Sequence, residues 1–146
     1  MIRPFEPRYL DALMALWLES TCAGHPFIDK EYWRESAAQV RDEYIPQSKT
    51  WLAMRDNQLS GFISILDEQF IGALFVAPSQ AGQGIGQRLL SHAKGQYSAL
   101  SLEVYQQNQR AVDFYYRQGF QIEDAAWQWS TQQPTWIMRW PKASAL

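Results

Sequence analysis

The chain has 146 residues, a mass of 17.0 kDa and a net charge of −2, from 13 Lys and Arg against 15 Asp and Glu. This length predicts a single domain spanning residues 1–146, with a hydrophobic core that needs neither disulfides nor metals. The single cysteine, Cys22, excludes an intrachain disulfide and fits a reducing compartment. Because there is no secretion signal and no apolar run long enough for a bilayer, we expect a cytoplasmic protein with no membrane contact.

The charge balance also argues against nucleic-acid binding. The pI is about 5.6 and the Arg and Lys residues are scattered, whereas a nucleic-acid surface needs them clustered on one face. The unusual feature is the aromatic content of 7 Trp, 7 Tyr and 7 Phe. Such residues build either a core or an aromatic-walled cleft, and composition does not distinguish the two.

The first half of the chain predicts a strand, two helices and a meander. After a short strand at residues 2–3, apolar residues at helical spacing predict a helix that ends before Gly24. A second helix follows the N-cap residue Asp29 and ends at Pro46. Alternating β-forming runs separated by polar turns then predict an antiparallel meander, with strands at 51–55, 61–66 and 70–76.

The second half predicts α/β structure. A glycine-rich loop leads into a helix that contains residues 85–93, followed by a strand at 99–104 and a helix at 109–118 capped by Gly119. Two strands close the chain: one starts at residues 120–122, and the other spans residues 135–140. The fold class is therefore mixed α/β (α+β), in which a right-handed crossover places the loop at the carboxyl end of a strand, where ligands bind.

The loop GQGIGQ places Gly82, Gly84 and Gly86 between a strand and a helix. Unpaired N–H groups at the positive end of a helix suit a phosphate or diphosphate, although a turn that requires positive φ explains such glycines about equally well. A P-loop is excluded because Gln87 and Arg88 follow Gly86. A dinucleotide-binding loop is a weaker alternative, since Gln87 replaces its third glycine and an antiparallel meander precedes it.

Two segments carry a family resemblance: VAPSQAGQGIGQRLL at 76–90 and LEVYQQNQRAVDFYYRQGF at 102–120. Together they resemble the GNAT superfamily of acyl-CoA-dependent N-acyltransferases, whose element order matches nearly the whole chain. The stretches GHPFI and PTWIM are similar to the small bacterial YiaC-like branch. At the loop position where the family usually has Arg or Gln, this chain has Ala81, with Gln80 one step earlier.

The resemblance implies a GNAT-type fold with acetyl-CoA as co-substrate and no metal. Backbone groups would hold the coenzyme, and the residues implied are Leu74, Phe75, Val76, Gly82, Gln83, Gly84, Ile85, Gly86, Gln87 and Asn108. Asn108 and Tyr115 lie seven residues apart, on one helix face and about 10 Å apart along the axis. Only an elongated ligand, such as the pantetheine arm of coenzyme A, touches both.

The resemblance also implies that Tyr115 is the general acid that protonates the coenzyme A thiolate. A phenol of pKa about 10 stays protonated at neutral pH and can donate to a nascent thiolate. Tyr116 is rotated by about 100° and is expected to pack elsewhere. Glu103 lies on the polar face of its strand, either solvated or in a cleft, and some family members use a Glu in this place as the base.

The acceptor is expected to be a primary amine, preferably a lysine side chain of a peptide or protein, because of the branch resemblance. A small-molecule amine, a protein N-terminus and a non-catalytic acyl-CoA-binding module are the alternatives. Residues 20–27 and 67–70 and the aromatic C-terminal end are expected to flank the acceptor. Phe70 would either wall this site or pack in the core, and the protein would be a monomer or homodimer. Four tryptophans of the C-terminal strands are expected in the core: Trp127, Trp129, Trp136 and Trp140. No chemical role is assigned to Cys22, His25 or His92.

Overall fold

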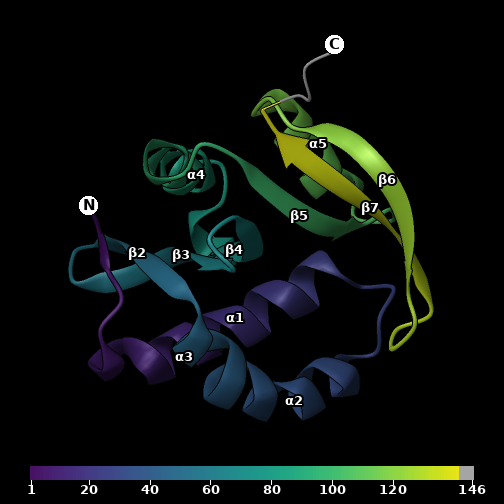
Figure 1. The fold of residues 1–146 in the computed structure, drawn as a ribbon. Helices are drawn as coiled ribbons and strands as arrows, with labels where there is room; N and C mark the ends of the chain where they lie inside the picture. The colour runs from purple at the N-terminus through teal and green to yellow at the C-terminus, as the bar shows by residue number, and fades with distance from the viewer. Residues whose placement is uncertain (142–146) are drawn as a thin grey trace.

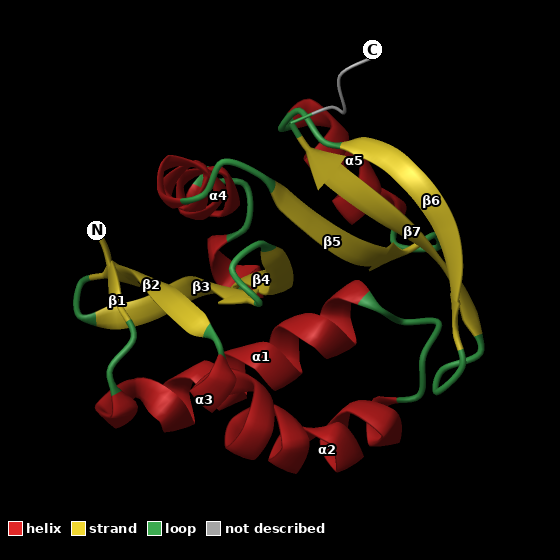
Figure 2. Cartoon of the chain, in the orientation of Figure 1, coloured by secondary structure: helices red, strands yellow, loops and turns green. Residues whose placement is uncertain are grey.

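A computed structural model describes residues 1–141 and shows a seven-stranded sheet with helices on both faces (Figures 1 and 2). The helices are α1 (Leu10–Gly24), α2 (Lys30–Gln39), α3 (Ile45–Gln47), α4 (Ile85–Gln96) and α5 (Gln109–Arg117). The strands are β1 (Ile2–Pro4), β2 (Lys49–Arg55), β3 (Gln58–Leu66), β4 (Phe70–Val76), β5 (Leu100–Tyr105), β6 (Gln121–Gln128) and β7 (Gln133–Trp140). The predicted element order and fold class are confirmed.

The strands follow the order β1-β2-β3-β4-β5-β7-β6, and only β4 and β5 are parallel neighbours. These two strands pair at a single position, Phe70 with Ser101, where the Ser101 amide also donates to the Gln69 carbonyl at 2.8 Å. Beyond this point β5 turns away from β4 (Figure 1). The sheet therefore opens between the carboxyl ends of its two central strands.

A β-bulge bends β4 on its way to this opening. The register with β3 shifts so that Ser64 faces Ala73 and Ile65 faces Ile71, which leaves Gly72 without a partner. A Cβ atom at Gly72 would lie 2.8 Å from Cδ1 of Leu66, so a larger residue there would require the Leu66 side chain to shift. The bulge thus changes the direction of the last residues of β4.

The two faces of the sheet have separate cores. Helices α4 and α5 cover one face, where Leu89, Leu90 and Phe120 are fully buried, and helices α1 to α3 cover the other, where Leu13 and Phe62 are fully buried. Strand alternation explains the division, because successive side chains of a strand point to opposite faces. In the described part of the chain, no helix is both long and apolar enough to cross a membrane.

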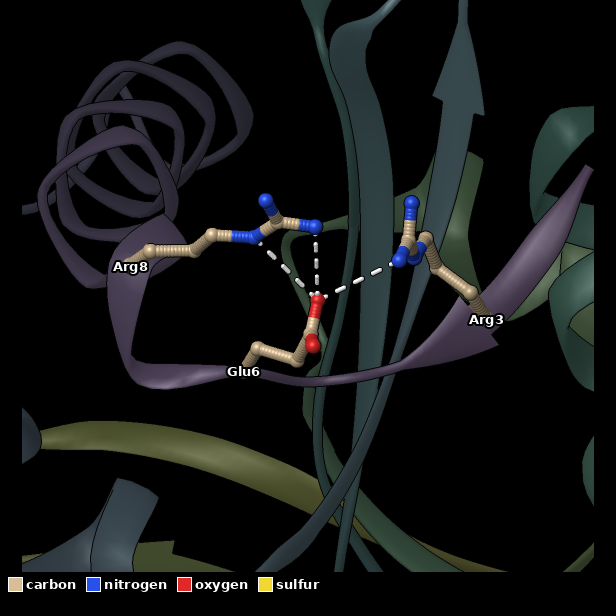
Figure 3. A network of polar contacts seen from close by, with 3 residues as sticks. All are labelled: Arg3, Glu6 and Arg8. Atoms are coloured by element: carbon tan, nitrogen blue, oxygen red, sulfur yellow. Dashed lines mark hydrogen bonds and ion pairs between the residues drawn. The ribbon is translucent and has the colours of Figure 1, made fainter.

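The N-terminal corner is held by a small charged network (Figure 3). Arg3 of β1 and Arg8 of the following 3₁₀ turn both bond one carboxylate oxygen of Glu6, at 3.2 and 3.0 Å. All three side chains are substantially exposed, so each pair contributes little stability.

Three predictions were wrong: two helix ends and the burial of two tryptophans. Helix α1 runs through Gly24, and His25 is its C-cap. Pro46 does not end the second helical region, which passes through a π turn at Val40–Tyr44 into α3 and contains Pro46 in the first turn of α3. Trp127 and Trp129 are 46% and 81% exposed, because they lie on and just after β6, the edge strand.

Candidate active site

The glycine loop joins β4 to α4 through a 3₁₀ turn at Pro78–Gln80. Gly82 and Gly84 have φ values of +81° and +77°, in the left-handed region that favours glycine. An added Cβ at either position would meet no atom within 4 Å. The main chain at these glycines is therefore open, and a bulky anion can approach it.

The amides of this loop lack internal partners. Within residues 1–141, the N–H groups from Gly82 to Gln87 make no hydrogen bond, and the first bond of the helix runs from the Arg88 amide to the Gly84 carbonyl at 3.0 Å. Gly84 is the N-cap of α4, so these amides lie at the positive end of a three-turn helix. An anion with several oxygens can satisfy them.

Sequence reasoning missed Arg55, which adds a positive charge to this loop. Its guanidinium donates to the side-chain oxygens of Gln80, at 3.2 Å, and Gln83. Arg55 ends β2, and β2 runs parallel in space to β4 with β3 between them, so both strands end at the same edge of the sheet. Ala81 lacks a charge of its own, and only the three-dimensional fold brings Arg55 to the loop.

The end of β4 supplies further backbone groups on the side facing the opening. Leu74 and Val76 pack against the α4–α5 core and Phe75 against the core of α1 and α2. The Val76 carbonyl accepts a hydrogen bond from the Ser20 hydroxyl of α1 at 3.1 Å, which ties this helix to the strand end. Strand β4 therefore presents an edge that β5 leaves unpaired beyond Phe70.

The C-terminal cap of α5 holds Tyr115 in place. The Gly119 amide donates to the Tyr116 carbonyl and the Phe120 amide to the Tyr115 carbonyl, at 3.1 and 3.0 Å, which is a Schellman motif with Gly119 at φ +93°. Its hydrophobic contact joins Tyr115 to Phe120, with ring centroids 5.5 Å apart. The pattern Y-x-x-x-G-F thus has a mechanical role, since it fixes the phenol on the helix.

Tyr115 and Tyr116 differ sharply in environment. Tyr115 is only 9% exposed and lies in the α4–α5 core, whereas Tyr116 is 42% exposed. Burial raises the pKa of the Tyr115 phenol above its ordinary value of 10, so the group stays protonated at neutral pH. The helical periodicity therefore separates the two tyrosines as predicted.

Asn108 is the N-cap of α5, as predicted. Its Oδ1 accepts from the Ala111 amide at 3.3 Å, and its Nδ2 lies 3.4 Å from Nε2 of His25 at the end of α1. Asn108 and Tyr115 therefore occupy the two ends of one short helix, which packs on the same side of the sheet as α4.

Glu103 lies on the other face of β5. Leu102 and Val104 are buried toward α4 and α5, so Glu103 and Tyr105 project toward α1 and α2. One oxygen of Glu103 accepts a hydrogen bond from the buried Thr135 hydroxyl at 2.6 Å. Glu103 is half-buried in this position.

The expected acceptor segments are not all brought together. Residues 20–25 reach the opening, through Ser20 and His25, but Asp67, Glu68 and Gln69 precede β4 and lie at the opposite edge of the sheet. There they line a separate cavity of about 620 Å³ with the residues that precede β5. Among the described residues, no group of three or more His, Cys, Asp or Glu side chains could hold a metal ion.

Comparison with known proteins agrees with this geometry. Residues 19–127 match the model of the acetyltransferase (GNAT) domain, and the chain belongs to this family of acetyltransferases. It is 47% identical to the peptidyl-lysine N-acetyltransferase YiaC of Escherichia coli (strain K12) over the full length of both chains. It is 35% identical, over 77% of this chain and 76% of the relative, to the peptidyl-lysine N-acetyltransferase YjaB of the same organism.

Solved structures show the same fold. The apo form of YjaB from Escherichia coli superimposes with a TM-score of 0.84 at 30% identity, covering 98% of both chains. The PaiA N-acetyltransferase of Thermoplasma acidophilum, in complex with coenzyme A, has a TM-score of 0.81 at 23% identity and covers 95% of this chain and 96% of its own. The predicted fold and family are confirmed.

Proposed function

We propose that this protein transfers the acetyl group of acetyl-CoA to a lysine side chain of a peptide or protein, by direct attack in a ternary complex. The observation that carries the proposal is the opening between β4 and β5, which has a glycine loop of unpartnered amides at its end. The diphosphate of coenzyme A fits the amides of residues 82–87, and its pantetheine arm fits the free edge of residues 74–76. The names of the two relatives support a peptidyl-lysine acceptor.

Tyr115 and Glu103 take complementary roles in this proposal. They lie on opposite faces of β5, so a thioester threaded between the strands has the phenol on its sulfur side and the carboxylate on the side from which the amine arrives. The amine nitrogen forms a bond to the carbonyl carbon, the carbon–sulfur bond breaks, Glu103 takes the amine proton and Tyr115 protonates the thiolate. Backbone amides of β4 would polarise the carbonyl.

A base is needed because the acceptor is a lysine. An amine of pKa about 10.4 at pH 7 costs about 4.6 kcal/mol to deprotonate, at 1.36 kcal/mol per unit. Glu103 keeps one carboxylate oxygen outside its bond with Thr135 and can accept this proton directly or through water. The cytoplasmic location, the single domain and the monomeric or homodimeric state stay predictions from the sequence.

The direct test is an acetylation assay with acetyl-CoA and three sets of acceptors: peptides with an internal lysine and a blocked N-terminus, peptides with a free N-terminus and no lysine, and polyamines. We expect release of the coenzyme A thiol and acetylated product, confirmed by mass spectrometry, with the lysine peptides only. Acetylation of the second or third set alone would replace the lysine assignment. Coenzyme A binding without turnover of any acceptor would favour a non-catalytic binding module.

A further inference from the structure

His25 lies where the end of α1 meets the start of α5, in an aromatic cluster of the α1–α2 side. The His25 side chain is buried, with only 8% of its surface exposed. Phe27, Trp33 and Tyr105 surround it, with ring centroids 5.7, 5.3 and 5.2 Å from the imidazole. A buried polar ring must satisfy its nitrogens, so the partners of His25 define its chemical state.

Both ends of a hydrogen-bond chain through His25 are fixed by backbone groups. Nδ1 lies 2.8 Å from the Thr21 carbonyl, which can only accept, so Nδ1 carries the proton. At the other end the Ala111 amide can only donate, so it fixes Oδ1 of Asn108 as the acceptor. The Asn108 Nδ2 therefore donates to the unprotonated Nε2 of His25 across the 3.4 Å between them.

We infer that His25 is a positioning residue for the coenzyme, because together with the Ala111 amide it fixes the orientation of the Asn108 carboxamide in this site. The inference rests on the proposed function, which gives Asn108 to the pantetheine arm. The network leaves one Nδ2 hydrogen of Asn108 outside the bonds to His25 and Ala111. That hydrogen suits an amide carbonyl of pantetheine, and it is presented only while the carboxamide is prevented from turning over.

The packing around the pair supports this role. A Cβ atom at Gly24 would lie 3.8 Å from Nδ2 of Asn108, so the last residue of α1 lies close to the carboxamide. His25 and Asn108 are 83 residues apart in sequence and belong to helices on opposite faces of the sheet. His25 therefore links the helix beside the expected acceptor to the residue expected to hold the coenzyme.

The test is a double-mutant cycle on coenzyme A binding, measured by calorimetry. His25→Phe keeps an aromatic ring of similar shape but removes both hydrogen bonds, and we expect it to weaken binding about tenfold. Asn108→Ala should weaken binding at least as much, and the double variant no more than Asn108→Ala alone. His25→Gln, which offers one donor and one acceptor at similar spacing, should restore most of the affinity.

Two outcomes overturn the inference: unchanged affinity in His25→Phe, or losses that add in the double variant, since packing alone then explains His25. If His25→Phe does not fold, retained affinity in His25→Gln supports the inference and a tenfold loss contradicts it. A separate readout is the ¹⁵N spectrum of the wild-type imidazole without ligand, where we expect protonated Nδ1 and unprotonated Nε2. The opposite tautomer contradicts the network, whereas wild-type protein that does not bind coenzyme A contradicts the proposed function instead.

Discussion

Tyr115 combines the two properties that a proton donor to a thiolate needs, a fixed position and a protonated hydroxyl. The Schellman motif and the contact with Phe120 fix the ring, and burial raises the pKa of the phenol. The phenol is thus held in the α4–α5 core in its protonated form.

We expect Tyr115→Phe to lower kcat about 100-fold or more, because the variant loses only the proton donor. The ring keeps its contacts, so the dissociation constant for coenzyme A and the melting temperature should change little. The matched control is Tyr116→Phe on the exposed neighbour, which should behave like wild type in steady-state kinetics. Equal rates for the two variants would remove Tyr115 from the mechanism.

His25 predicts a pH dependence of stability. Desolvation by burial lowers its pKa in the folded protein, partly offset by the bond to the Thr21 carbonyl, while the unfolded chain titrates near 6.5. Below about pH 6.5 the unfolded state therefore binds more protons than the folded state, so the free energy of unfolding falls as the pH falls through this range and then levels off below the folded pKa. The aromatic neighbours Phe27, Trp33 and Tyr105 carry no charge there.

Urea denaturation from about pH 7.5 down to about pH 5 measures this dependence. The wild type should lose stability more steeply than His25→Phe, in which the titrating group is gone. Above pH 7 the slopes of the two proteins should agree. Parallel curves over the whole range would show that His25 keeps its ordinary pKa in the folded state.

At the scale of elements, the diphosphate site that we propose in the loop between β4 and α4 depends on glycines that leave the main chain open. Gly84→Ala places a Cβ at a residue with φ +77°, which costs about 1–2 kcal/mol in the folded state, and it obstructs the approach of the diphosphate. We expect the dissociation constant of this variant for coenzyme A, measured by calorimetry, to rise by about tenfold or more.

The matched control is Gly95→Ala, near the end of the same helix, where the added Cβ meets nothing within 4 Å. This change should stabilise the protein by about 0.5–1 kcal/mol and leave coenzyme A binding unchanged. Should Gly84→Ala bind coenzyme A as well as Gly95→Ala does, the loop does not hold the phosphates.

Arg55 extends this site to a second element, the end of β2. We expect Arg55→Gln to weaken coenzyme A binding about three- to tenfold and to reduce its dependence on salt, since a cation beside the loop is lost. The same comparison with 3′-dephospho-coenzyme A shows whether the 3′-phosphate or the diphosphate is its partner. Arg117→Gln, an exposed arginine at the far end of α5, is the control; equal affinities for the two variants contradict a role for Arg55.

Local patterns predicted the elements of this site well, because its motifs are contiguous. The glycine loop, the cap residue Asn108 and the difference between Tyr115 and Tyr116 all depend on residues within one or two turns of each other. The partners of these residues were not predictable, since the bonds from Arg55 to Gln83 and from Asn108 to His25 span 28 and 83 residues. An isolated histidine in GHPFI carries no spacing signal that would reveal such a bond.

At the scale of the whole molecule, sheet topology decides where Trp127 and the acidic turn at Asp67 and Glu68 lie. Trp127 lies on an edge strand and packs against Trp129 with ring centroids 6.2 Å apart, so periodicity placed it in a strand but could not show that this strand lies at the edge of the described sheet, with β7 on one side. Asp67 and Glu68 were expected beside the acceptor, yet they lie at the edge where β4 and β5 are joined. Strand order accounts for the first difference and strand direction for the second, and a single sequence states neither.

The same topology gives the molecule its two-sided site. Helices α4 and α5 bring the open loop and Tyr115 to one face of the sheet, and α1 and β5 bring His25 and Glu103 to the other, with the opening between β4 and β5 connecting them. A coenzyme can enter from the loop while the acceptor amine approaches from the opposite face. This arrangement suits direct transfer without a covalent enzyme intermediate.

A crystal structure with coenzyme A bound measures this arrangement most directly. The account predicts the diphosphate on the amides of residues 82–87, the pantetheine arm along residues 74–76 between the two strands, and the sulfur within hydrogen-bond reach of the Tyr115 hydroxyl. A coenzyme seated elsewhere, or a sulfur on the Tyr115 side of the sheet but beyond reach of that hydroxyl, would contradict it.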